Sequence, residues 1–214
     1  MGDPTYDAFY SSTVQFLSND TEAQYKMQAA GSALLDKIGN AILVTHSQGG
    51  LYGWTIADAR PNRVKAIIAI EPTGPQFRDA VFGTKPNRAW GLTDIPMTYE
   101  PPVLNATDLV TEEMPSPAPQ VLVSCLLQKE PAKKWKNFSK IPILVVTSEA
   151  GYHSQYDHCS WMFLKQVGCE KVEFMRLERM GVRGNSHMMF MEKNNLRVAE
   201  KLIDWLRGKA VMVY

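Results

Sequence analysis

Uninterrupted apolar runs recur along the chain and predict buried strands. Residues 41–44 (Ala-Ile-Leu-Val), 64–70 and 141–147 are mainly apolar and show no regular apolar–polar alternation. Runs of this kind are typical of strands that are covered on both faces of a parallel sheet. The segment 171–177 is shorter and alternates more, which predicts a strand at the edge of the same sheet.

Helical spacing of apolar residues separates these strands. Residues 21–38 carry apolar side chains three or four positions apart, and Gly39 provides a stop. Residues 48–59, 155–167 and 195–207 also predict helices. The last of these is expected to bury five side chains: Leu196, Ala199, Leu202, Ile203 and Leu206. Strand, helix and strand in succession predict an α/β fold with a parallel sheet and right-handed crossovers.

Two segments break this alternation. Residues 1–21 are polar and aromatic, and they predict a loop with one short helix. Residues 73–140 hold most of the 13 prolines, together with scattered aromatic and methionine side chains, and only residues 121–130 have a helical pattern. Irregular insertions of this length are usually functional. We therefore expect residues 1–214 to form a single α/β domain in which residues 73–140 are a cap-like or lid-like insertion.

Composition and charge limit the classes of binding partner that the sequence suggests. The formal net charge is +1, which gives no indication of a nucleic-acid or anionic-membrane partner. No apolar run approaches the roughly 18 residues that a membrane-spanning helix needs. Residues 1–6 lack the basic and then apolar pattern of a signal peptide. The compartment stays open: cytoplasmic by default, secreted if a leader and an N-terminal half are missing.

The three cysteines are Cys125, Cys159 and Cys169. Their odd number and wide spacing match neither a disulfide framework nor a metal-binding knuckle. Pairing of Cys159 with Cys169 and a fully reduced chain are both compatible with the sequence. No metal or cofactor is expected.

The strand at 41–44 leads into Thr45-His46-Ser47-Gln48-Gly49-Gly50, where candidate chemistry begins. This segment matches the G-x-S-x-G turn with Thr45 in place of the first glycine, and such a turn exposes its serine at the carboxyl edge of a sheet. Ser47 is therefore a candidate nucleophile, and the Gln48 N–H is a candidate oxyanion donor at a helix N-terminus. The alternative is that Ser47 only caps the following helix, but a cap does not explain the two glycines that follow.

A serine nucleophile needs a base, and the chain has four histidines. His187 follows the last predicted strand in a loop rich in Gly, Asn and Ser, on the sheet edge where the serine is expected. It is the favoured base. His46 precedes the serine and is interpreted as structural, whereas His153 and His158 are expected at the surface or in the cap.

A carboxylate must orient the base and stabilise its charged form. Glu71 follows the second predicted strand and Glu149 follows the third, so both leave the correct edge of the sheet. Asp157 is a more distant third candidate. The loop that holds Glu149 is the commoner site in such sheets, and composition does not decide between the two glutamates.

Four segments together resemble a family of bacterial and fungal esterases within the α/β-hydrolase superfamily. They are residues 45–50 (Thr-His-Ser-Gln-Gly-Gly), 69–72 (Ala-Ile-Glu-Pro), 184–189 (Gly-Asn-Ser-His-Met-Met) and 194–206. The resemblance covers about residues 40–72 and 141–207, and the Pro-rich insertion matches only loosely.

The resemblance implies which acid is used. In that family the acid is a glutamate directly after the strand that follows the nucleophile strand, which here is Glu71 rather than Glu149. The implied activity is hydrolysis of a small-molecule carboxylic ester by Ser47, His187 and Glu71, with the Gln48 N–H in the oxyanion hole and without a cofactor.

One departure from the family stands out. Such hydrolases carry several strands before the nucleophile, and one of their loops supplies a second oxyanion donor, but only 40 residues precede this strand and none of them predicts a strand. The chain is therefore expected to be N-terminally truncated, a partial sequence, or completed by a partner. The strand at 41–44 is then an exposed edge through which two copies can pair. The alternative function is a weakly active or inactive hydrolase-like domain that binds a ligand or a partner.

Overall fold

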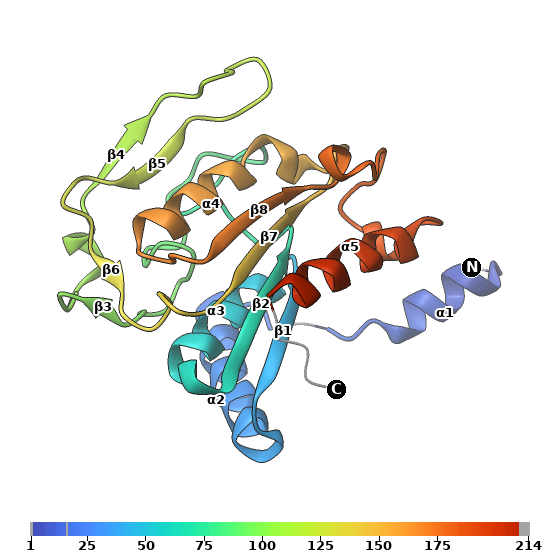
Figure 1. Cartoon of the computed structure of the whole chain (residues 1–214), viewed down its shortest axis with the longest axis horizontal. Coiled ribbons are helices and arrows are strands. Elements are labelled where there is room, and N and C mark those ends of the chain that lie inside the picture. Colours follow the sequence, from blue (N-terminus) through green and yellow to red (C-terminus); the bar gives the residue numbers. More distant parts are fainter. Residues whose placement is uncertain (1, 16, 210–214) are drawn as a thin grey trace.

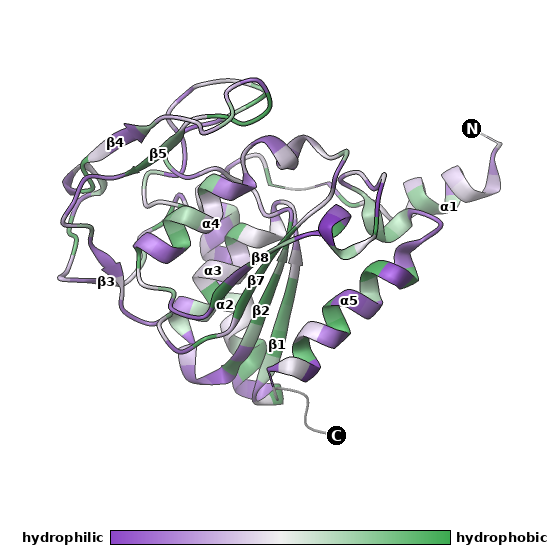
Figure 2. Cartoon of the chain, turned by 45° about the horizontal axis from the view of Figure 1, so that its top comes forward, coloured by the Kyte–Doolittle hydropathy of each residue, from purple (hydrophilic) through white to green (hydrophobic). Residues whose placement is uncertain are grey.

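A four-stranded parallel sheet forms the centre of the molecule. The computed structural model describes residues 2–15 and 17–209. The strand order is β1 (Ala41–His46), β2 (Val64–Ile70), β7 (Ile143–Thr147) and β8 (Val172–Arg176), and every neighbouring pair is parallel. The four predicted strands and the edge position of the last one are confirmed. Figure 1 shows the four strands side by side, and Figure 2 shows that β1, β2 and β7 are mainly apolar.

Helices cover both faces of this sheet (Figure 1). The helices are α1 (Pro4–Ser12), α2 (Asp20–Ile38), α3 (Gly49–Ala59), α4 (Asp157–Gln166) and α5 (Asn195–Gly208). Short 3₁₀ turns are η1 (Pro61–Arg63), η2 (Ala106–Asp108), η3 (Tyr152–Gln155), η4 (Leu177–Met180) and η5 (Met189–Met191). The four helices predicted at 21–38, 48–59, 155–167 and 195–207 are confirmed to within a few residues at each end. Helix α1 buries none of its side chains and extends away from the sheet.

The two faces of β2 divide the core. Ile67 and Ala69 point to one side, where they pack with Leu35 of α2 and Trp54 of α3, and with Phe163 of α4. The alternate residues of β2 pack on the other side against apolar side chains of α5: Val198, Trp205 and Leu206. Successive strand residues point to opposite faces. Because both sides of β2 are covered, its mainly apolar run needs no polar alternation.

Strand β1 is less buried than its apolar run predicts. It pairs with β2 on one side only and is an outer strand of the sheet. Its residues are mostly half-buried, and the side chain of Val44 is 59% exposed. The prediction that this strand is buried on both faces is wrong, whereas its edge position agrees with the expected exposed edge.

The long segment between β2 and β7 contains two small antiparallel strand pairs. One joins β3 (Tyr99–Glu100) to β6 (Lys134–Trp135), and the other joins β4 (Thr111–Met114) to β5 (Cys125–Gln128). The predicted helix at 121–130 is wrong because β5 occupies its centre. The seven apolar or small residues at 121–127 fit a strand as well as a helix, and pairing with β4 decides between them.

The buried face of α5 also differs from the prediction. Val198, Trp205 and Leu206 are buried against the sheet, and Leu202 packs beside them. Leu196 is 74% exposed and Ile203 is 38% exposed, so the prediction that both are buried is wrong. The buried residues form a stripe with helical spacing that includes a tryptophan, and this stripe fixes the rotation of the helix about its axis.

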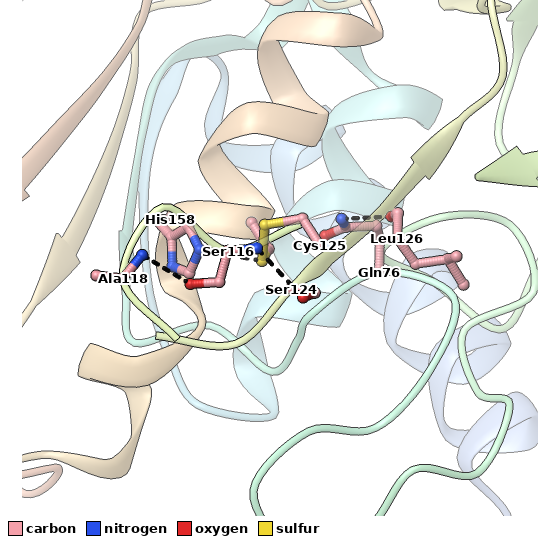
Figure 3. Close-up of a disulfide and its surroundings, with 8 residues drawn as sticks. Gln76, Ser116, Ala118, Ser124, Cys125, Leu126 and His158 are labelled. Atoms are coloured by element: carbon pink, nitrogen blue, oxygen red, sulfur yellow. Dashed lines mark hydrogen bonds between the residues drawn. A yellow bond between two sulfur atoms is a disulfide. The ribbon is translucent and has the colours of Figure 1, made fainter. Parts of the chain in front are cut away.

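A disulfide joins Cys125 of β5 to Cys159 of α4, with the two Cα atoms 5.1 Å apart (Figure 3). The pairing of Cys159 with Cys169 that the sequence left open is wrong, because Cys169 is a free, buried thiol. The His158 side chain lies beside the bond, with Nε2 3.4 Å from Cys159 Sγ. The disulfide therefore ties the segment between β2 and β7 to the helix that packs on the sheet.

No helix in the described parts of the chain is both long enough and apolar enough to cross a membrane.

The disulfide is expected to raise the free energy of unfolding. It closes a loop of 34 residues, and cross-linking a loop of that size stabilises a folded chain by about 3–4 kcal/mol. We expect reductant, or the double variant Cys125→Ala/Cys159→Ala, to lower the free energy of unfolding by about this amount in urea titrations. The double variant should no longer respond to reductant. An unfolding midpoint of the unsubstituted chain that reductant leaves unchanged would contradict the assignment.

Candidate active site

Ser47 lies in a sharp turn between β1 and α3. Its φ angle is +54°, in the left-handed region that a non-glycine residue adopts only under local constraint. The Ser47 carbonyl accepts hydrogen bonds from the backbone N–H groups of Gly50 and Thr73, both at 2.9 Å, and its own N–H donates to the Ile70 carbonyl at 3.1 Å. These three bonds hold the strained residue between the two strand ends. The serine side chain is therefore presented at the carboxyl edge of the sheet.

Helix α3 has a gap that accommodates Thr45, the residue that departs from the usual glycine. A Cβ atom added at Gly53 would lie 2.9 Å from Thr45 Cγ2, whereas one added at Gly49 would lie 3.8 Å from Thr45 Cβ. Gly53 therefore leaves the space that the threonine methyl group occupies. The motif usually avoids crowding through a glycine at the end of the strand. Here the missing side chain is that of Gly53, about one turn into the helix.

Glu71 directly follows β2 and has no solvent exposure. Its φ angle is +40°, so this residue too sits in constrained backbone geometry. Oε1 accepts hydrogen bonds from the backbone N–H of Ser148, at 2.9 Å, and from the Ser148 hydroxyl. Buried carboxylates are tolerated only when hydrogen bonds replace their water. The end of β7 therefore supplies this replacement for the carboxylate that follows β2.

His187 lies on the loop between η4 and η5, and neighbouring polar residues fix this loop. The side chain of Asn185 is buried and donates to Asn194 Oδ1 at 2.7 Å and also to Glu192. The Asn185 carbonyl accepts from the Ala150 N–H at 2.9 Å, which fastens the loop to the end of β7. The His187 carbonyl hydrogen-bonds to His46 Nε2 at 2.9 Å.

These elements bring Ser47, Glu71 and His187 together. His187 Nε2 lies 3.0 Å from Ser47 Oγ, and His187 Nδ1 lies 2.7 Å from Glu71 Oε2. With Nδ1–H donating to the carboxylate, Nε2 is left free to accept the serine proton. Nucleophile, base and orienting acid within hydrogen-bond reach are the geometric requirement of nucleophilic acyl transfer.

The other two carboxylates that the sequence analysis weighed point elsewhere. Glu149 pairs with Arg183 at 2.7 Å and accepts from the Gly184 N–H at 2.9 Å. The Arg183 guanidinium holds the pKa of Glu149 below its usual range. Asp157 is fully buried and bonds to Thr147 Oγ1 at 2.5 Å and to His153 Nδ1 at 3.0 Å.

One of the remaining histidines, His153, differs from the sequence-based expectation. His153 is 1% exposed rather than at the surface, so that prediction is wrong. Burial lowers the pKa of His153 to about 3, so its ring is neutral at ordinary pH. His158 is half-buried beside the disulfide. The structural interpretation of His46 agrees with its bond to the His187 backbone, and its ring centroid lies only 4.5 Å from that of His187.

Two groups in the described chain have three potential metal ligands within 4.8 Å of one another: Glu71, His153 and His187, and Cys125, His158 and Cys159. The rings of His153 and His187 are parallel to within 3° with centroids 4.8 Å apart. Imidazole lone pairs lie in the ring plane, so the two stacked rings cannot point to one ion as they stand. In the second group the two sulfurs are bonded to each other. In this geometry neither group can bind one metal ion through all three of its ligand atoms.

Apolar side chains surround the approach to His187. The Tyr152 ring lies 5.0 Å from the His187 ring, and the exposed Phe82 ring lies 4.8 Å from Tyr152. Phe190 packs edge-on against His46, with ring centroids 4.9 Å apart. Phe82 comes from the segment between β2 and β7, so this segment reaches the rim of the site.

The fold, a parallel sheet flanked by helices, is that of the α/β hydrolases. No protein-family model matches the chain. Among curated proteins, the chain is similar to the probable secreted lipase phiG of Fungal sp. (strain ATCC 74256), with 48% identity over 208 residues, 97% of this chain and 57% of the relative. The chain thus spans little more than half the length of this relative.

Solved structures agree on the fold. A novel bacterial esterase matches with a TM-score of 0.51 and 24% identity, over 85% of this chain and 42% of that protein. Est1E from Butyrivibrio proteoclasticus, solved with ferulic acid bound, matches with a TM-score of 0.50 and 12% identity, over 88% of this chain and 70% of that protein.

The contact between Thr45 and Gly53 can be tested by a double-mutant cycle. Gly53→Ala places a methyl group against Thr45 Cγ2, and overpacking of this kind costs about 1–3 kcal/mol. In a Thr45→Ala background the same change should cost nothing or stabilise the chain slightly, because alanine favours helix more than glycine. Urea unfolding of the four proteins measures the coupling. An equal cost of Gly53→Ala in both backgrounds would contradict this interpretation of the turn.

Proposed function

We propose that the chain is a serine hydrolase that cleaves a carboxylic ester through an acyl-enzyme intermediate. Ser47 is the nucleophile, His187 the general base and Glu71 the residue that orients the base. The observation that carries the proposal is the continuous hydrogen-bonded relay from Ser47 Oγ through both nitrogens of His187 to Glu71, at 3.0 and 2.7 Å. The similarity to a probable lipase supports the same reaction.

In this mechanism Ser47 Oγ attacks the ester carbonyl carbon while His187 Nε2 takes the hydroxyl proton. His187 then gives that proton to the leaving alkoxide as the carbon–oxygen bond breaks, which releases the alcohol and leaves the acyl group on Ser47. A water molecule, deprotonated by the same nitrogen, then attacks the acyl carbon. The bond from that carbon to Ser47 Oγ breaks, His187 returns the proton to Oγ, and the acid is released. Glu71 is buried and bonded to Nδ1, so it stabilises the imidazolium that forms in each step.

The negative charge that develops on the carbonyl oxygen needs donors. Gln48 follows the nucleophile and is the N-cap of α3, so its backbone N–H lies at the positive end of the helix. Backbone donors placed in this way stabilise the tetrahedral intermediate, and one donor contributes about 10²–10³ in turnover. We propose the Gln48 N–H as one member of the oxyanion hole.

The surroundings of His187 favour a moderately apolar ester. Tyr152, Phe82 and Phe190 provide aromatic surface next to the relay. We propose that residues 73–140 act as a cap and contribute the Phe82 side of this surface, with the disulfide holding the cap against α4. Apolar side chains bind an acyl or alkyl group by removing its surface from water.

A second candidate is a weakly active or inactive hydrolase-like domain that binds a partner. The outer position of β1 and the 59% exposure of Val44 favour it. The backbone groups along the outer edge of such a strand can pair with a strand of another chain. Turnover by a monodisperse monomer would argue against this alternative.

Loss of the nucleophile or of the base should abolish turnover. We expect the folded chain to hydrolyse p-nitrophenyl acetate and butyrate, and Ser47→Ala and His187→Ala each to lower kcat by about 10⁴ or more. Circular dichroism of both variants should match that of the unsubstituted chain. Activity that survives in Ser47→Ala would contradict the proposal.

The two glutamates give a matched test of the acid. Glu71→Gln keeps the side-chain shape but removes the charge that stabilises the imidazolium, so kcat should fall by about 10²–10⁴. Glu149→Gln changes an exposed pair with Arg183 and should leave kcat within about twofold. The steady-state kinetics of both variants decide, and a larger loss in Glu149→Gln than in Glu71→Gln would overturn the assignment.

A further inference from the structure

A second buried histidine lies against the proposed base. The ring of His153 is parallel to that of His187 to within 3°, with centroids 4.8 Å apart, and His153 is almost completely buried. Tyr152 and His46 also contact the His187 ring, but at angles of 45° and 38°. Of the three neighbours, His153 alone offers a flat face to the imidazole. The mechanism described above assigns it no role.

Three polar side chains hold His153 in this orientation. Its Nδ1 bonds to Asp157 Oδ1 at 3.0 Å, and its Nε2 bonds to the Tyr156 hydroxyl at 3.1 Å. Asp157 in turn accepts from Thr147 Oγ1 at 2.5 Å, at the end of β7. Both ring nitrogens are used, so the ring cannot flip or rotate without breaking a buried hydrogen bond.

We propose that His153 is a positioning residue for the ester hydrolysis inferred above: its fixed ring stacks on His187 and holds that imidazole in the plane that contains Glu71 and Ser47. The inference rests on the proposed function of the Ser47, His187 and Glu71 relay. It adds a residue that touches neither the substrate nor the reacting atoms and acts through the base.

The need for such support follows from the reaction. While Ser47 carries an acyl group, its oxygen no longer offers a hydroxyl proton to His187, and the bond to Glu71 is the one hydrogen bond of the relay that still holds the ring. A single hydrogen bond at Nδ1 does not by itself prevent rotation of the ring out of its plane, and Tyr152 and His46 meet the ring at an angle. Water must then be activated by Nε2 in the correct place, and a misplacement of about 1 Å can cost about 10²-fold in rate. A flat neighbour on the ring face restricts that rotation.

The charge state of His153 suits this role. The groups that face it are Asp157, Tyr156, Tyr152, His187 and Glu71. Burial lowers the pKa of His153 and raises that of Asp157, so one proton lies in the hydrogen bond between them and the ring carries no charge. A neutral ring does not oppose the positive charge that His187 gains in each step.

Neighbouring residues at the end of β7 link the two histidines. Ser148 bonds to Glu71, which orients His187, and Thr147 bonds to Asp157, which orients His153. The strand end thus positions the acid of the relay and the stacking partner of its base together.

Two substitutions separate stacking from hydrogen bonding. His153→Phe keeps a flat ring but loses both hydrogen bonds, whereas His153→Gln keeps polar groups for Asp157 and Tyr156 but loses the ring. We expect His153→Gln to lower kcat for p-nitrophenyl butyrate by about tenfold or more with KM within twofold, and His153→Phe to retain kcat within about threefold. His158→Gln, in the adjoining helix α4, is the matched control and should leave both constants unchanged, since its side chain lies beside the disulfide.

The result that overturns the inference is equal kcat in His153→Gln and the unsubstituted chain, or a loss in His153→Phe as large as that in His153→Gln. If His153→Gln does not fold, as judged by circular dichroism, His153→Leu replaces it. That variant also removes the flat ring and should lower kcat by about tenfold, and an unchanged kcat would then overturn the inference. An unsubstituted chain without Ser47-dependent turnover instead refutes the proposed function, and the inference with it.

Discussion

The structure of the site depends on one buried carboxylate. Glu71 is removed from water and has three donors, the N–H and hydroxyl of Ser148 and the ring N–H of His187. The donors and the carboxylate come from different segments of the chain: Glu71 follows β2, Ser148 follows β7, and His187 lies on the loop before α5. An unpaired buried charge would cost several kcal/mol, so satisfying this one fixes the relative positions of the strand ends and of the histidine loop. The relay to Ser47 is a consequence of this arrangement.

Parallel pairing places these groups on one edge. Because β1, β2 and β7 run in the same direction, the residues that follow them, Ser47, Glu71 and Ser148, emerge together. The backbone at Ser47 and Glu71 is strained in the same sense, with positive φ at both positions. Strain of this kind persists where surrounding bonds over-determine the conformation, and here the neighbouring strand ends provide those bonds.

Much of the fold follows from local patterns, because apolar runs and helical spacing reflect burial directly. The strand–helix–strand order, the edge position of β8 and the residues Ser47 and His187 could be named from such patterns, whereas Glu71 is favoured over Glu149 only by the resemblance to an esterase family. Three further features could not be predicted. The strand at Cys125 and the pairing of that residue with Cys159 depend on which segment packs against α4, and short apolar runs carry no such information. The burial of His153 depends on Asp157 and Tyr156, which share its segment but become its partners only once η3 and α4 have formed. Gly53 makes room for Thr45 from a helix position that no motif includes.

The central claim is that this relay makes Ser47 a reactive nucleophile in the folded chain. The most direct measurement is labelling with a fluorophosphonate, followed by intact mass and peptide mapping. If the relay activates Ser47, we expect one adduct per folded chain, located on Ser47, and no adduct in Ser47→Ala or in the urea-unfolded chain. Equal labelling of the unsubstituted chain and of Ser47→Ala, or an adduct mapped to another residue, would contradict it.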